Sequence, residues 1–460
     1  MRPARNPLAA RRPARRGTIL IVTLWIVLVL AGLTLMLARA MRVEAVCAAN
    51  ELAALQAEAI EQGAVQYVLS RVDSLQGEGP VESDTPCEVV RVGAGAFWIL
   101  RPDYENDAAC VYGISDEAAK ANLNIAPVEM LAKLPGMTQE LAASVVDWRD
   151  GDANPTPGGA ESEYYLLLPE PYQCKNAPLE TVEELLLVKD FTPEILFGED
   201  VNRNGMLDAN EDDADVSAPP DDRNGALDRG LAPFVTVHSV EPNISADGER
   251  RVNLNDVQNQ QPLFDLLREK LSADRAIVLT DRVRRERPFR NVLDFHIRAG
   301  LTPAEFQAVA DHLTTNPASV LRGLVNVNTA PRAVLASLPG LDDTDAAALI
   351  AKRSESGVDL GSVAWVAQAL RPEKAVAIGD FITTRTYRFS ADIVSVAGNG
   401  RAFRRCRIVV DAQTSPPKVL YRQDLTHLGW PLSQDILDKI RAGTPLDEIA
   451  TTRTVLQEAQ

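Results

Sequence analysis

The sequence has few of the residues that enzymatic catalysis usually requires. Its 460 residues include four histidines, which are His238, His296, His312 and His427. None of them lies in a spacing typical of a zinc protease, and the chain has neither a nucleophile-elbow serine motif nor a phosphate-binding loop motif. We therefore expect isolated packing or surface histidines and no enzymatic activity.

Cysteine is also scarce. The five cysteines are Cys47, Cys87, Cys110, Cys174 and Cys406, and no two of them form a CxxC pair. A zinc site built from cysteines is therefore not expected. The spacing does not fix disulfide connectivity, so the pairings Cys87–Cys110 and Cys174–Cys406 both stay open, with one thiol left over.

Positive charge is scarce outside the very start of the chain. The net charge is −17, and six arginines with no acidic residue lie in the first 17 positions, so the remainder carries −23. Such an excess of carboxylates repels polyanions and attracts cations. The composition therefore disfavours nucleic-acid binding and favours a cation site.

An uncharged apolar run follows the basic start. It extends from Thr18 to Ala38, and Arg39 closes it. As a helix these residues would reach about 31 Å, which is enough to span the hydrocarbon core of a bilayer. The arginines before the run predict a cytoplasmic N-terminus and an exported remainder.

The helical pattern continues beyond the apolar run. Neither proline nor paired glycines interrupt it before Gly77. The sequence predicts one helix of about 55 residues, apolar first and amphipathic afterwards. A secretory signal peptide would have a shorter apolar core and a small-residue cleavage site after it.

Strand-like segments occur in two widely separated parts of the chain. They are residues 89–92, 97–100, 109–112, 387–394 and 403–410. The last two flank a Gly-Asn-Gly turn at 398–400, which is typical of a hairpin. We predict an α+β fold in which a long N-terminal helix packs on a small antiparallel sheet, and a large helical domain is inserted between the two groups of strands.

The predicted insertion contains an internal repeat. Residues 122–127 (NLNIAP) and 326–331 (NVNTAP) are each followed by a Leu-Pro-Gly turn, at 134–136 and 338–340, so the offset is 204 throughout. A weaker third copy begins at Val252. Each unit predicts an asparagine-capped helix, a Pro-Gly turn and a second helix.

These units resemble helix-hairpin-helix (SAM-like) motifs, many of which bind DNA phosphates through backbone amides at the hairpin. The phosphate-binding form usually needs a second glycine two residues after the first. Those positions are Thr138 and Asp342 here, and Asp343 and Asp345 add further carboxylates. We interpret the repeats as a helical packing module and keep a membrane-anchored, exported DNA-uptake receptor as the alternative function.

One acidic loop fits the twelve-residue calcium-binding pattern of EF-hands. It runs from Asp200 to Glu211, with Gly205 at the sharp turn and Leu207 as the expected apolar plug. Oxygen-only ligands favour Ca²⁺ over transition metals. The predicted ligands are Asp200, Asn202, Asn204, the carbonyl of Met206, Asp208 and Glu211.

Two other acidic groups are weaker or alternative candidates. A shortened echo of the loop has Pro220 and Leu231 at its first and twelfth positions. Its candidate ligands are Asp222, Asn224 and Asp228, and the alternative cluster is Asp150, Asp152 and Glu161. Calcium at any of these places would be structural, because neighbouring carboxylates repel one another without a cation. Pro193 and Gly198 before the loop leave open whether a regular EF-hand helix pair forms.

The N-terminal signal resembles the class III signal of type IV pilins and type II secretion pseudopilins. In those families a peptidase cleaves after the glycine, which is Gly17 here, so Thr18 would become the mature N-terminus. Most members carry a glutamate at the fifth mature position, where this chain has Val22. The K-type minor pseudopilin family lacks that glutamate, and the chain is similar to this family.

A second stretch carries the same resemblance. Residues 147–188 include the sequences DWRDGD, GGAE and NAPL and a pair of tyrosines. K-type pseudopilins carry a similar stretch between their two helical subdomains, and calcium has been associated with their helical domain. The resemblance extends from residue 15 to about residue 195, and includes the later repeat and the terminal strands.

The resemblance implies a structural subunit at the tip of the type II secretion pseudopilus, supporting export of folded proteins across the outer membrane. It implies an inner-membrane, single-pass protein with a cytoplasmic N-terminus and a periplasmic bulk. The prepilin peptidase would cleave it, methylation would follow, and its partners would be the major and the other minor pseudopilins. The expected segments are a leader (1–17), a transmembrane and amphipathic helix (18–76), the first part of the sheet (77–115), the inserted helical domain (116–380), the second part of the sheet (381–425) and a tail (426–460).

Two further interpretations stay open. A calcium-stabilised adaptor anchored by an uncleaved signal would keep residues 1–17 after export. A run of arginines is either a solvated helix face or a docking surface for an acidic partner. Its members are Arg282, Arg284, Arg285, Arg287 and Arg290.

Overall fold

The computed structural model describes residues 16–75 and 86–449, apart from residues 105, 108, 109, 215 and 218. The predicted leader up to residue 15, the predicted end of the long helix near Gly77 and the predicted tail from residue 450 lie outside the described residues.

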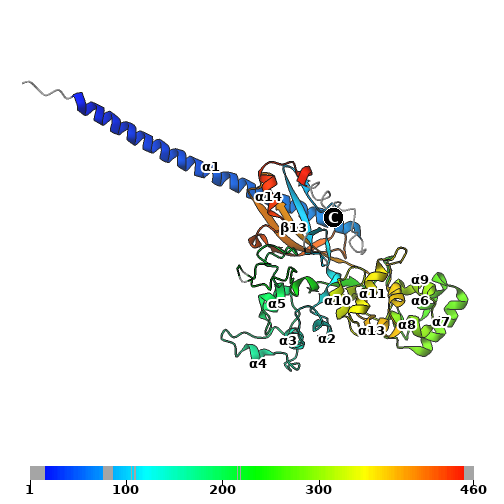
Figure 1. Ribbon diagram of the computed structural model, residues 1–460. Helices are drawn as coiled ribbons and strands as arrows, with labels where there is room; N and C mark the ends of the chain where they lie inside the picture. Colours follow the sequence, from blue (N-terminus) through cyan, green and yellow to red (C-terminus); the bar gives the residue numbers. More distant parts are fainter. Residues whose placement is uncertain are drawn as a thin grey trace, which may run out of the picture.

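A single helix, α1 (Arg16–Leu75), forms the N-terminal part of the fold, as predicted. Its first half is exposed, and the second half lies on a sheet (Figure 1). The buried side chains recur every three or four residues, which places them on one face of the helix. They are Ala53, Ala57, Ile60, Ala64, Val68 and Val72.

The sheet is antiparallel and has seven strands, in the order β1-β2-β13-β14-β15, with β3 beside β2 and β4 beside β13. Its strands are β1 (Val90–Val92), β2 (Gly95–Arg101), β3 (Val111–Tyr112), β4 (Ser115–Asp116), β13 (Arg388–Val396), β14 (Phe403–Asp411) and β15 (Lys418–Asp424). Segments about 270 residues apart in the sequence therefore share one sheet, as the α+β prediction required. Strand β15 was not predicted.

The two faces of the sheet are covered by different elements. On β13, Phe389, Ala391 and Ile393 face α1, whereas Val394 and Val396 face the opposite side. That opposite side is covered by the C-terminal helix α14 (Gln434–Arg441), which follows η6 (Thr426–Leu428). Residues 434–441, predicted as part of a tail, thus belong to the core.

Between β4 and β13 the chain forms the insertion, which has its own continuous core. Its first part contains η1 (Glu117–Ala119), β5 (Ala121–Asn122), α2 (Val128–Leu131), α3 (Gln139–Arg149), α4 (Ser162–Tyr165), η2 (Val182–Leu187), α5 (Pro193–Phe197), η3 (Ala232–Phe234), β6 (Val235–Thr236) and β7 (Val240–Pro242). The second part contains β8 (Val252–Asn253), α6 (Gln261–Lys270), α7 (Ala273–Glu286), α8 (Val292–Ala299), α9 (Pro303–Val309), η4 (Ala310–His312), β9 (Leu313–Thr314) and β10 (Val320–Arg322). The third contains β11 (Val325–Asn326), α10 (Arg332–Ser337), α11 (Asp343–Arg353), η5 (Val363–Trp365), α12 (Val366–Ala369), α13 (Pro372–Ile378) and β12 (Ile382–Thr383).

Each of the three parts is closed by a short parallel strand pair: β5 with β6, β8 with β9, and β11 with β12. The sequence did not predict these pairs, because a two-residue strand has no periodicity to read.

The Asn-x-Asn motif recurs with the same hydrogen bond in all three parts. The Oδ1 atoms of Asn122, Asn253 and Asn326 each accept the backbone N–H two residues later, at 2.9, 2.9 and 3.0 Å. These asparagines do not cap helices: Pro127 and Pro331 occupy the N-caps of α2 and α10 without a side-chain cap. The predicted asparagine caps were therefore wrong, because the side chains stabilise the turn before each helix instead.

The second asparagine of each motif ties its turn to a distant segment. Asn124 exchanges two hydrogen bonds with the backbone of Leu179, and Asn255 does so with the backbone of Phe289. In the third copy Asn328 donates to the Leu360 carbonyl at 2.9 Å. The copy at Val252 thus shares these hydrogen bonds with the other two.

Neither of the disulfides considered for the cysteines forms among the described residues. Cys87 lies in the core between α1 and the sheet, whereas Cys110 lies in the core on the other face. Cys174 is in the core of the insertion, and Cys406 is beside α1. The sheet thus separates the members of the first pair, and the second pair lies in different cores.

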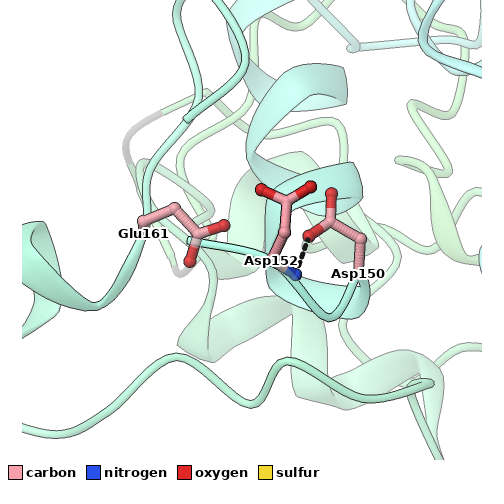
Figure 2. A group of neighbouring side chains, drawn as sticks. All are labelled: Asp150, Asp152 and Glu161. Atoms are coloured by element: carbon pink, nitrogen blue, oxygen red, sulfur yellow. Dashed lines mark hydrogen bonds between the residues drawn. The ribbon is translucent and has the colours of Figure 1, made fainter. Parts of the chain in front are cut away.

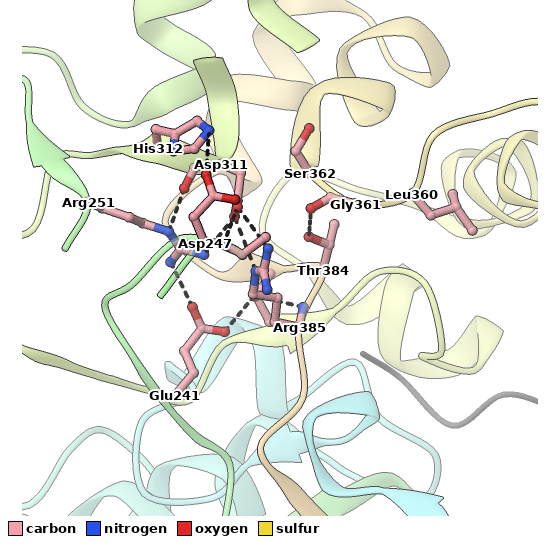
Figure 3. A network of polar contacts seen from close by, with 12 residues as sticks. Glu241, Asp247, Arg251, Asp311, His312, Leu360, Gly361, Ser362, Thr384 and Arg385 are labelled. Atoms are coloured by element: carbon pink, nitrogen blue, oxygen red, sulfur yellow. Dashed lines mark hydrogen bonds and ion pairs between the residues drawn. The ribbon is translucent and has the colours of Figure 1, made fainter. Parts of the chain in front are cut away.

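A buried ion network centred on Asp311 joins the second part of the insertion to its neighbours (Figure 3). Arg251 and Arg385 donate to its carboxylate at 3.2 and 2.8 Å, and Arg251 also pairs with Glu241 at 3.0 Å. Burial alone would raise the pKa of Asp311, but the Ala246 N–H and the two guanidinium groups outweigh it and lower that pKa. The charged form is therefore the one that the fold stabilises.

Replacing Asp311 by alanine would leave two buried guanidinium groups without their shared partner. We expect Asp311→Ala to lower the free energy of unfolding by about 3 kcal/mol, measured by urea denaturation. Asp247→Ala is the matched control, because Asp247 is 61% exposed and its ion pairs with Lys270 and His312 are both 3.8 Å long. The control should change stability by about 0.5 kcal/mol or less; equal effects of the two variants would contradict a central role for the network.

Candidate functional sites

The predicted cleavage site lies in the first turn of α1, since the helix begins at Arg16 and includes Gly17 and Thr18. Within the described residues, Thr18–Leu75 is the one helix whose length and composition suit a membrane span. No other part of the chain that the structure describes covers its most apolar stretch. A single-pass anchor fits this helix.

Two carboxylates close the predicted calcium loop around backbone amides. Asp200 accepts the N–H groups of Asn204 and Gly205, both at 2.9 Å. Glu211 accepts those of Val201 and Asp208, at 3.1 and 3.0 Å. Gly205 has a φ of +75°, which makes the sharp turn that the sequence predicted. The side chains of Asp200 and Glu211, at the first and twelfth loop positions, therefore point into the loop.

Three further predicted ligands meet in the loop, although not as a filled calcium site would arrange them. The amide nitrogens of Asn202 and Asn204 lie 2.6 and 3.0 Å from the same Asp208 oxygen. Amide N–H groups thus face the carboxylate where calcium would need amide oxygens. The residue types fit calcium, and the two amide orientations do not.

Burial governs the protonation of Glu211. Loss of hydration raises the pKa of its carboxyl to about 7. The nearby charges of Asp200 and Asp208 also raise this pKa, whereas the hydrogen bonds from the Asp208 and Val201 N–H groups lower it in part. Burial also raises the pKa of Asp200. A loop with buried carboxylates that resist ionisation is one that a cation would stabilise.

The loop also connects the insertion to the sheet. Arg405 on β14 is fully buried, pairs with Asp392 on β13 at 2.7 Å, and donates to the carbonyls of Asn202 and Arg203. Met206 packs with Trp98 in the core under α14. The buried apolar plug is therefore Met206; the prediction of Leu207 was wrong, because Leu207 is only half-buried.

The helix pair of a regular EF-hand does not form around the loop. The short helix α5 precedes it, and the next helical element among the described residues is η3, beyond the echo loop. Pro193 begins α5 and Gly198 ends it, with φ of +62° at the glycine.

The echo loop uses a glutamate that sequence reasoning missed. Glu199 accepts the N–H groups of Asp222 and Asp228, at 3.4 and 3.2 Å, much as Glu211 does in the first loop. The Asn224 side chain accepts from Ala226, and its amide donates to Asp222 at 2.8 Å. Glu199 precedes both loops, so a search for a twelfth-position ligand could not find it. The three predicted residues of this loop are exposed.

The alternative cluster brings Asp150, Asp152 and Glu161 together (Figure 2). One ligand oxygen from each carboxylate lies within 4.8 Å of the others, and no other acidic, histidine or cysteine trio among the described residues meets this condition. Asp150 follows the end of α3, Asp152 lies in the adjoining turn, and Glu161 precedes α4. The sequence motif DWRDGD and the later GGAE thus meet in space.

Glu161 is the unusual member of this cluster. It is 4% exposed, and neither carboxylate oxygen has a hydrogen-bond partner. Burial raises its pKa, and the charges of Asp147 and Asp150 raise it further. A buried carboxylate without a donor is costly unless a cation or proton neutralises it. The cluster therefore fits a bound cation better than the loop does.

The helix pairs of the repeat form at the predicted positions, with Gly136 and Gly340 in the left-handed conformation at the turns. At the hairpins, Thr138 caps α3, and Asp342 caps α11 by accepting the N–H groups of Thr344 and Asp345. At the second hairpin, the backbone N–H groups that a phosphate would need are thus already hydrogen-bonded to the Asp342 carboxylate. This arrangement disfavours DNA binding at the second hairpin.

The four histidines lie apart in the structure. The ring of His296 stacks on Phe306 with centroids 4.3 Å apart, and His238 contacts Tyr421. Burial lowers the pKa of both imidazoles. These contacts are those of packing residues, as the sequence predicted.

Comparisons with known proteins match separate parts of the chain. Two family models, both described as type II secretion system protein K, match residues 111–197 and 325–378. No curated protein matches the chain. A similar solved chain comes from the crystal structure of the GspK-GspI-GspJ complex of the enterotoxigenic Escherichia coli type 2 secretion system. The two chains are 14% identical, and their TM-score is 0.41. The match covers 80% of this chain and 96% of the solved one.

The long apolar helix fits a single-pass membrane anchor, and it packs on an antiparallel sheet in a mixed α+β fold. Residues 111–197 and 325–378 are thus similar to the type II secretion system protein K family, the family of minor pseudopilins that the sequence resembles. Pseudopilins are structural subunits, which is consistent with the expectation that the chain is not an enzyme.

The pKa of Glu211 predicts how cation-free protein responds to pH. Between about pH 4.5 and 7 the folded state holds a proton that the unfolded state releases, so stability should fall as pH rises through this window. Glu211→Gln should remove this part of the slope. Urea unfolding of both proteins in chelator across the window measures the difference, and parallel stability curves would contradict it.

Proposed function

We propose that the chain is a minor pseudopilin at the tip of the type II secretion pseudopilus, where it supports export of folded proteins across the outer membrane. The observation that carries the proposal is the division of α1. Its second half packs on the chain's own sheet, whereas the described side chains from Thr18 to Ala48 are all exposed. Such an unpaired apolar half suits insertion in a membrane and packing against other pseudopilin helices.

The insertion supports the tip position. It lies at the end of the sheet away from the projecting half of α1 (Figure 1). Its mass at that end would prevent another subunit from adding above. Val22 stands where most type IV pilins and pseudopilins have a glutamate, and a subunit with nothing above it needs no carboxylate for the N-terminus of a following subunit.

The basic residues before the apolar run support an inner-membrane orientation with a cytoplasmic N-terminus and a periplasmic bulk. In this function the partners are the prepilin peptidase, the major pseudopilin and other minor pseudopilins. Thr18 to Leu37 would contact the neighbouring pseudopilin helices.

We also propose that the periplasmic part binds structural calcium. Asp150, Asp152 and Glu161 would hold one ion, supported by their converging oxygens and by the unpartnered Glu161 carboxylate. The loop ligands Asp200 to Glu211 would hold another once the two asparagine amides turn. Bound calcium would neutralise carboxylates that otherwise repel one another and would stabilise the fold without taking part in chemistry.

Cleavage after Gly17 separates the pseudopilin function from an uncleaved adaptor. We expect the membrane-extracted chain to begin at Thr18 when the cognate prepilin peptidase is present and to keep residues 2–17 when it is absent, because the basic leader and Gly17 form the processing signal. Intact-mass measurement and N-terminal sequencing check this. A chain that retains the leader in both strains would overturn the pseudopilin assignment of the signal.

Calcium stoichiometry tests the two cation sites separately. We expect two ions per chain by calorimetric titration, one lost in Asp150→Asn/Asp152→Asn and the other in Asp200→Asn/Glu211→Gln. The matched control, Glu269→Gln, changes an exposed carboxylate on α6 and should leave both ions bound. Unchanged binding in a site variant would rule out that site.

A further inference from the structure

The strongest unexplained surface feature is a basic region in an acidic protein. Residues 268–298 contain nine lysines and arginines against five acidic residues, a net charge of +4, whereas the whole chain carries −17. This segment runs from the end of α6 through α7 to the end of α8. Figure 1 shows α7 at the outer edge of the insertion, on the side away from the sheet.

Helix α7 has two different faces. Ala276, Leu279 and Val283, at i, i+3 and i+7, are buried against the neighbouring helices. On the outer face, Ile277 and Val278 are 59% and 54% exposed. A pair of adjacent β-branched side chains in water is unusual on a helix that already buries an apolar face.

Two arginines stand beside the exposed apolar pair. Arg284 and Arg285 lie seven residues after Ile277 and Val278, so each shares a row with one of them. Their side chains are 64% and 73% exposed, and both pair with Asp281. One carboxylate thus faces two guanidinium groups. The excess positive charge belongs to the whole segment 268–298, because Asp274 also lies on this face.

These ion pairs can be exchanged for others at little cost. An exposed Arg–Asp pair contributes about 0–1 kcal/mol, so an arriving carboxylate can take over a guanidinium without a large penalty. Arginine also binds carboxylates through two parallel hydrogen bonds, which adds geometric selectivity. The apolar pair would add contact area that surface charge alone lacks.

We propose that the outer face of α7, defined by Ile277, Val278, Arg284 and Arg285, is a docking surface for an acidic segment of a partner protein. Charge complementarity selects that partner. A lipid surface is the less favoured partner, because helix α7 has no aromatic residue to anchor in lipid. This surface is separate from α1 and from both candidate cation sites.

Binding of fluorescein-labelled poly-L-glutamate to the full chain in neutral detergent tests the charge requirement. We expect Arg284→Glu/Arg285→Glu to weaken binding at low salt at least tenfold, and Arg284→Lys/Arg285→Lys to weaken it much less. The matched control, Arg322→Glu/Arg371→Glu, reverses two exposed arginines elsewhere on the insertion and should bind like the unaltered chain. An equal loss in the control would overturn the assignment to α7.

A photo-crosslinking residue at position 277, in cells that produce the complete secretion system, tests the class of partner. We expect an adduct with another protein through a net-acidic peptide, identified by mass spectrometry and lost in Arg284→Glu/Arg285→Glu. Adducts only with a second copy of the chain would overturn the proposal. So would binding to phosphatidylglycerol vesicles without any protein adduct. Matching thermal unfolding of the variants checks that the surface changes leave the fold intact.

Discussion

The packing of α1 on the sheet is the contact on which the rest of the structure depends. Small side chains at Ala53, Ala57 and Ala64 allow the helix to lie close to the strands, and the Ser395 hydroxyl on β13 donates to the Ala57 carbonyl at 2.9 Å. At Gly95 a Cβ atom would lie 2.3 Å from the Val396 carbonyl oxygen and 2.5 Å from the Ile60 side chain, so only glycine permits this approach. The same rigid helix then continues into its exposed apolar half, which links the position of the globular part to that of the membrane anchor.

The insertion is organised differently, by polar ties rather than by one long element. Its asparagine motifs connect turns to distant backbone, and the Asp311 network connects the second part to β7 and to the segment after β12. Arg405 makes a further polar connection, because it links the loop after α5 to the sheet through hydrogen bonds. Because Arg405 donates to carbonyls inside the predicted calcium loop, the conformation of that loop and the seating of the insertion on the sheet depend on one another. A structural cation there would act on both.

Periodicity determined how much could be predicted from the sequence. The long helix, the β13–β14 hairpin and the helix pairs of the repeat have strong periodic or turn signals, and all lie where predicted. Strand β15 was missed because its side chains are mostly exposed. Helix α14 is amphipathic, but its segment was assigned to the tail, and the sheet face that it covers is not visible in the sequence. The roles of Glu199 and of the asparagines depend on contacts between segments far apart in sequence. The cluster of Asp150, Asp152 and Glu161 was offered only as an alternative, since spacing does not show which turns of the chain meet.

The distribution of charge assigns different tasks to different parts of the insertion. Where carboxylates are buried without donors, as at Glu161, the cost of desolvation can be met by a cation that several oxygens share. On the exposed helix α7 arginines outnumber carboxylates. Their guanidinium groups need no counter-ion to remain charged, because water already solvates them. A cation at Glu161 would therefore stabilise the fold, whereas the arginines of α7 need no bound ion for the fold to be stable. Within the chain Arg284 and Arg285 make exposed ion pairs with Asp281, and the docking surface that we propose would give them a contact outside the chain.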